Sequence, residues 1–145
     1  LPRIRSDYAE KALAKVIYRD FPLANNEHAR EAATFAHCAG EQGSYWKAFD
    51  VLKSHPQEIE SGKFNLLQKL LPNLNQGDMS LCLRSVRYEK EIDLDQAQGR
   101  ALGAKGAPSM FIGKLAADRS YHGVFVRGAQ PYPVIQQEIE RALKR

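Results

Sequence analysis

The most constraining feature of the sequence is a long helical block that separates its segments of strand character. Residues 15–21, KVIYRDF, combine β-branched and aromatic side chains and predict a buried strand. Residues 109–128 predict a β-hairpin, in which the second strand alternates between apolar and polar positions. The sequence between these segments predicts helices over 27–42, 44–54, 65–74, 79–86 and 87–103.

Helices also flank this arrangement. The first residues predict a helix that ends near residue 14, and Pro131 or Pro133 is expected to open a last helix whose apolar face includes Ile135 and Ile139. The order is therefore helix, strand, four or five helices, hairpin and helix. This order indicates an α/β fold with a helical insertion over approximately 26–103, in a single domain that covers residues 1–145.

Composition excludes several classes of function. The chain has 145 residues and a net charge of +4, and its basic residues are scattered rather than clustered with aromatic residues. We therefore expect no nucleic-acid binding. Its apolar runs are too short for a membrane span.

The cysteines and histidines predict no metal site. Cys38 and Cys82 lie far apart and neither belongs to a CxxC motif, and the four histidines have no ligand spacing with them. From these residues alone, the two cysteines are either small buried hydrophobic residues or partners in a structural disulfide. The two interpretations remain open at this point.

The chain also lacks the common catalytic signatures. It contains no GxSxG, no glycine-rich phosphate loop and no HExxH. Glu41 and Gln42 precede an aromatic stripe. We interpret them as capping residues in preference to residues that line a pocket. The acidic pairs of the helix at 87–103, such as Asp93 and Asp95, are interpreted as a solvated face, and Asp78 is expected to cap the helix at 79–86.

Four stretches together nevertheless resemble one family. They are VIYRDFPL (16–23), HCAGEQGSYWKAFDVL (37–52), GAPSMFIG (106–113) and VRGAQPY (126–132). In order and spacing they resemble the thioredoxin-fold thiol:disulfide oxidoreductases of the DsbA type, over roughly residues 9–145. The resemblance implies a bacterial, periplasmic or otherwise extracytoplasmic protein that exchanges disulfides with polypeptide substrates, works with a redox partner protein and needs no cofactor.

The resemblance implies a role for Ala107 and Pro108. In thioredoxin-like folds a cis-proline precedes the hairpin, and the residue before it offers its backbone to the substrate polypeptide. Carried over to this chain, Pro108 is that proline and Ala107 is the residue that binds the substrate.

The resemblance also implies that part of the site is missing. Members of the family carry a CxxC at the start of a helix, after a first core strand, and LPRIRSDYAEKAL resembles only the later part of that helix. We therefore expect the CxxC and the strand to lie upstream of Leu1, so that the chain is N-terminally truncated, has no catalytic residue and is redox-inactive as given. The expected strand would lie between 15–21 and 109–113, and self-association could fill its place.

Two alternative functions are considered for the chain, together with a disulfide between Cys38 and Cys82. The main alternative is a thioredoxin-fold module that binds peptides or proteins without redox chemistry; a glutathione-handling enzyme is disfavoured because no serine or tyrosine is placed to activate a thiol. For Cys38 and Cys82 the resemblance favours a structural disulfide. Such a bond would close a loop of some 44 residues and contribute about 4 kcal/mol to stability in the chain-entropy model.

Overall fold

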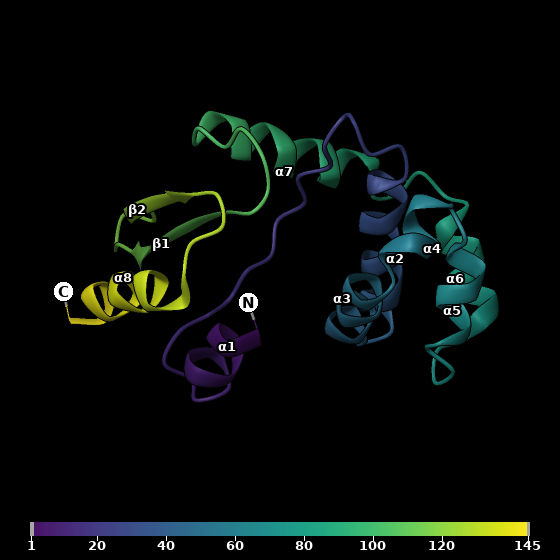
Figure 1. Cartoon of the computed structure of the whole chain (residues 1–145), viewed down its shortest axis with the longest axis horizontal. Coiled ribbons are helices and arrows are strands. Elements are labelled where there is room, and N and C mark those ends of the chain that lie inside the picture. The colour runs from purple at the N-terminus through teal and green to yellow at the C-terminus, as the bar shows by residue number, and fades with distance from the viewer. Residues whose placement is uncertain (1, 145) are drawn as a thin grey trace. The chain divides into compact units, whose positions relative to one another are not determined.

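The structure is a computed structural model that describes residues 2–144 (Figure 1). The chain divides into two compact units. The first takes the N-terminal residues up to Arg19 and the residues from Gly99 onward, and the second is Asp20–Gln98. The second unit overlaps the predicted helical insertion, and the assignment of 1–145 to one domain stays a prediction.

The first unit packs a hairpin against the C-terminal helix. Strand β1 (Ser109–Leu115) pairs antiparallel with β2 (Tyr121–Arg127), in the predicted hairpin, and α8 (Tyr132–Lys144) packs against β1 (Figure 1). The N-terminal residues form α1 (Pro2–Ile4) and a π-helical turn, η1 (Arg5–Ala9). The buried core of this unit consists of Ile4, Tyr8, Ile112, Ile135 and Ile139.

The apolar face predicted for the last helix is part of this core. Ile135 and Ile139 lie one turn apart in α8, so both project from the same side of the helix, and both are buried. Burying each such side chain contributes about 1.5–3 kcal/mol. Two contacts between side chains tie η1 to α8: the Tyr132 hydroxyl donates to the Asp7 carboxylate, and the Tyr8 hydroxyl lies 3.4 Å from Glu140 Oε1.

The prediction of a strand over 15–21 is wrong. Residues 14–23 have no regular secondary structure, and the only sheet among the described residues contains β1 and β2. Val16 packs against the core of the first unit, whereas Ile17 is 53% exposed. A strand requires a hydrogen-bonded neighbour. No neighbour for this segment exists in the part of the chain that the structure describes, so its β-type residues remain extended without a ladder.

The second unit is helical. It contains α2 (Ala29–Glu41), α3 (Tyr45–Ser54), α4 (Pro56–Glu60), α5 (Phe64–Lys69) and α6 (Gln76–Leu83), and α7 (Glu89–Ala101) begins in it. α2 packs against both α3 and α6 (Figure 1). Phe35, Leu67 and Met79 are fully buried between these helices, beside Cys38 and Cys82. The short helix α4 is an addition to the predicted helices.

The prediction that Asp78 caps the helix at 79–86 is wrong. α6 begins at Gln76, and the Asn75 side chain caps it by accepting hydrogen bonds from the backbone N–H groups of Gly77 at 3.0 Å and Asp78 at 3.2 Å. Asn75 has an extended backbone and is among the residues preferred at this position. The helix therefore starts three residues earlier than the sequence predicts, and Asp78 lies inside its first turn.

Candidate functional site

The loop between α7 and β1 carries the predicted substrate-binding residues. α7 ends in a left-handed turn at Gly103, whose φ is +88°. The N–H of Gly103 donates to the Arg100 carbonyl at 2.9 Å, and the N–H of Ala104 donates to the Gly99 carbonyl at 2.9 Å. This pair of bonds is a Schellman motif, in which glycine is favoured because a side chain would be strained at positive φ. The motif fixes where the loop begins.

Ala107 and Pro108 lie at the exposed part of this loop. Both residues are exposed, and the peptide bond between them is cis. The Ser109 hydroxyl donates to the Gly106 carbonyl at 2.7 Å, which ties the loop together across the two residues. Within residues 2–144, the N–H and C=O of Ala107 make no hydrogen bond. These backbone groups are therefore available to an extended chain that approaches the loop.

Arg127 connects the same loop to β2. It lies directly opposite Ser109 in the hairpin register, and its Nε donates to the Gly103 carbonyl at 3.4 Å. Its guanidinium also lies 5.7 Å from the centre of the Phe125 ring. Arg127 is not among the predicted site residues, although it lies in VRGAQPY, one of the stretches that carry the resemblance.

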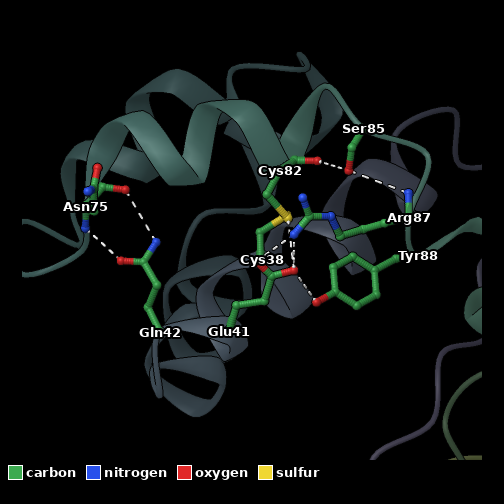
Figure 2. The surroundings of a disulfide bond; sticks show 8 residues. All are labelled: Cys38, Glu41, Gln42, Asn75, Cys82, Ser85, Arg87 and Tyr88. Carbon is green, nitrogen blue, oxygen red and sulfur yellow. Dashed lines mark hydrogen bonds and ion pairs between the residues drawn. A yellow bond between two sulfur atoms is a disulfide. The ribbon is translucent and has the colours of Figure 1, made fainter.

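Cys38 and Cys82 are joined by a disulfide (Figure 2). The bond connects α2 to α6, with the two Cα atoms 5.8 Å apart. The two residues are 1% and 2% exposed. No free cysteine remains among the described residues. Because thiol–disulfide exchange begins with attack by a thiolate, neither cysteine offers the nucleophile for it in this state.

Polar side chains cover the disulfide. Glu41 accepts hydrogen bonds from Arg87 Nη1 at 2.7 and 2.9 Å and from the Tyr88 hydroxyl at 2.6 Å (Figure 2). Glu41 Oε1 also lies 3.7 Å from Cys82 Sγ, which is a contact and not a hydrogen bond because a disulfide sulfur carries no proton. We call Glu41, Arg87 and Tyr88 the polar cover.

The polar cover shifts the ionisation of its members. The hydrogen bond from Tyr88, followed by that from Arg87, lowers the pKa of the Glu41 carboxyl. Burial, followed by the hydrogen bond to Glu41, raises the pKa of Tyr88 to about 12. Glu41 is therefore ionised and Tyr88 is neutral across the physiological range.

Gln42 fastens the same two helices at a second point. Its Oε1 accepts from the Asn75 backbone N–H at 2.7 Å, and its Nε2 donates to the Asn75 carbonyl at 3.3 Å (Figure 2). Glu41 and Gln42 end α2, as their interpretation as capping residues predicts. The contacts of their side chains with α6 and with the residues after it are an addition that the sequence does not indicate.

A part-buried pair of His37 and Asp20 lies against the ring of Tyr88. His37 Nε2 is 2.6 Å from Asp20 Oδ2, and the His37 ring stacks on Tyr88 with the ring centres 4.6 Å apart. The Asp20 carboxylate hydrogen bond raises the pKa of His37 above its ordinary value. The Asp20 backbone N–H in turn donates to Asp95 Oδ2 at 3.0 Å.

The interpretation of Asp95 as part of a solvated face is wrong. Asp95 is 4% exposed and lies three residues after the buried Ile92, on the same side of α7. This spacing could have indicated from the sequence that Asp95 is buried. A polar residue on the apolar face of a helix is expected to be buried and to have a hydrogen-bond partner. Asp93, by contrast, is exposed and forms an ion pair with Arg30.

The described residues contain neither a cluster suited to a metal ion nor a helix suited to span a membrane. No group of three or more histidine, cysteine, aspartate or glutamate side chains is arranged to hold a metal ion. None of the helices described is long and apolar enough to cross a bilayer.

Known proteins resemble this chain in sequence. A family model described as thioredoxin matches residues 1–122. The chain is also 24% identical over 124 residues to a protein named probable disulfide bond formation protein D, from Bacillus anthracis. That alignment covers 80% of this chain and 57% of the relative, so the chain spans little more than half of the relative's length. No solved structure matches the chain.

Proposed function

Because the chain belongs to the thioredoxin family, we propose that it acts in thiol–disulfide exchange with polypeptides outside the cytoplasm, and that Ala107 and Pro108 hold the substrate chain. The name of the Bacillus anthracis relative supports exchange chemistry. The Cys38–Cys82 disulfide supports an oxidising compartment, because such bonds persist there.

One observation carries the assignment of the binding loop. Ala107 is exposed, and its backbone N–H and C=O are unpaired in the described chain, at the point where the chain enters β1. An extended polypeptide that docks there gains main-chain hydrogen bonds without displacing any that the protein already makes.

The exchange itself needs a thiol pair that these 145 residues do not provide. A thiolate attacks a sulfur of the substrate disulfide and forms a mixed disulfide, and the other substrate sulfur leaves as a thiolate. A second thiolate then attacks the mixed disulfide and releases the reduced substrate, while the pair becomes oxidised. Cys38 and Cys82 are bonded to each other and buried, so we propose that a CxxC motif outside this sequence supplies the pair.

The binding loop is tested with a substitution that blocks it. Titration calorimetry of the chain with insulin B chain, its cysteines methylated, should show binding that Ala107→Trp weakens by about tenfold or more. The new side chain projects from an exposed position, so the fold tolerates it. Ala117→Trp, at an exposed position in the turn between β1 and β2, is the matched control and should bind as the unmodified chain does. Equal binding by the two variants would remove the loop from the proposal.

A second candidate function is a peptide-binding module without redox chemistry. The observation in its favour is that the described residues contain no free cysteine. The coding sequence upstream of Leu1 discriminates the two, because a CxxC there supports the oxidoreductase and its absence supports the binding module.

A further inference from the structure

The candidate binding loop lies in a part of the chain without acidic residues. No aspartate or glutamate occurs between residues 96 and 117 or between residues 119 and 137. These segments contain the end of α7, the loop, both strands and the start of α8. The charged side chains within these two segments are therefore all basic.

Two of these basic side chains flank the loop. Arg127 lies opposite Ser109, the residue after Pro108, and its guanidinium reaches the Gly103 carbonyl. Lys105 lies within the loop itself, two residues after Gly103. Both side chains belong to exposed residues, and neither has a carboxylate partner in the part of the chain that the structure describes. We call Lys105 and Arg127 the basic rim.

Some other cations of the protein are paired with carboxylates. Arg30 pairs with Glu89 and Asp93, and Arg87 pairs with Glu41. The basic rim has no such internal acid, so its positive charge is available to a bound molecule. Lys105 is two residues before Ala107, and Arg127 pairs in register with Ser109, two residues after it, so we expect a chain docked on the loop to come near both charges.

We propose that the basic rim makes this loop select polypeptide segments that carry aspartate or glutamate beside the residue held at Ala107. This inference rests on the proposed function, since it specifies which polypeptides the loop holds. Exposed ion pairs are weak individually, so two of them give a preference of about threefold to tenfold over an uncharged segment at low ionic strength. Salt screens the preference because both cations face solvent.

A polypeptide fits these observations better than an anionic membrane or a nucleic acid. The rim contains two cations rather than a broad basic surface, and the groups between them are the N–H and C=O of a peptide backbone. Those groups pair with another extended chain. A phosphate-rich surface would use the charges and leave the backbone carbonyl unpaired.

Fluorescence anisotropy with matched peptides tests the inference. The probes are labelled extended peptides with a central methylated cysteine, which differ only in flanking glutamate, glutamine or lysine. We expect affinity for the 145-residue chain to fall in that order at low salt, and the differences to shrink at about 0.5 M salt. The double variant Lys105→Gln/Arg127→Gln should bind the three peptides equally.

Two further variants separate local charge from other effects. Lys114→Gln/Arg119→Gln makes the same change of charge towards the other end of the hairpin and should retain the preference. Arg127→Lys should also retain it, because the lysine keeps the charge and loses the bond to the Gly103 carbonyl. Loss of the preference in either variant would contradict a local charge effect.

The remaining outcomes distinguish the inference from the proposed function. If the chain binds none of the peptides, the proposed function fails. If it binds all three equally, the proposed function stands and the basic rim has no selective role. Tighter binding to phosphatidylglycerol vesicles than to the glutamate peptide, abolished by the double variant, would overturn the inference in favour of a membrane surface.

Discussion

At the scale of the residue, acidic side chains join segments of the second unit that are distant in sequence. Asp20 pairs with His37, Asp95 accepts from the Asp20 backbone, and Glu41 holds Arg87 and Tyr88. Figure 2 shows how the last group lies over the disulfide. The partners lie 17 to 75 residues apart in the chain, so no local pattern in the sequence reveals them.

The His37–Asp20 pair predicts how stability depends on pH. The folded protein raises the pKa of His37, through the hydrogen bond to Asp20 and with a further contribution from Glu91 and Asp95. Its stabilisation is therefore fully present below the ordinary pKa of 6.5 and is lost as the pH rises through the raised value. Urea unfolding should show a larger loss of stability from about pH 5.5 to about pH 9 in the unmodified chain than in His37→Asn.

Asp20→Asn is the control for this pH effect. It keeps the shape of the side chain and removes the charge, so the pKa of His37 measured by NMR should fall towards its ordinary value. An unchanged pKa in Asp20→Asn would show that another group is responsible.

At the scale of the element, the disulfide joins two helices of the second unit, and the hairpin forms the sheet of the first unit. Reducing Cys38–Cys82 frees the ends of a loop that spans 44 residues. The double variant Cys38→Ala/Cys82→Ala should lower the free energy of unfolding by about 4 kcal/mol in urea denaturation. A reductant should destabilise the unmodified chain and leave the variant unaffected. Equal stability of the two proteins would mean that packing alone fixes α2 on α6.

The hairpin depends on two facing glycines. Gly113 and Gly123 pair directly across the strands, and a Cβ at Gly113 would overlap the His122 carbonyl oxygen. Gly113→Val should therefore destabilise the first unit by roughly 1–3 kcal/mol or disrupt the pairing, as thermal unfolding would show. Gly106→Ala is the control, because the added methyl group meets open space and should change stability little.

Some helices and strands could be predicted from the sequence, and others could not. Amphipathic helices such as α2, α3 and α8 follow their apolar spacing, and the hairpin follows its alternating second strand. The segment at 15–21 fails because β-type residues form a strand only beside a neighbour. Ala107 and Pro108 are proposed from the resemblance alone, since composition says nothing about exposed backbone groups.

At the scale of the whole molecule, the edge of β1 away from β2 carries a further prediction. Among the described residues β1 pairs with β2 alone, and an unpaired edge is a template for another strand. We therefore expect the chain to self-associate as its concentration rises, which sedimentation velocity would detect. A single monomeric species over the whole concentration range would contradict this expectation.

The burial of the disulfide has a consequence for a protein with the proposed chemistry. A protein that rearranges disulfides in other chains is exposed to its own reactants, and any accessible bond of its own becomes a competing substrate. Cys38 and Cys82 are 1% and 2% exposed, with Glu41, Arg87 and Tyr88 over them. If the chain takes part in the proposed exchange, we expect burial to keep this bond from reacting with the thiols of other chains.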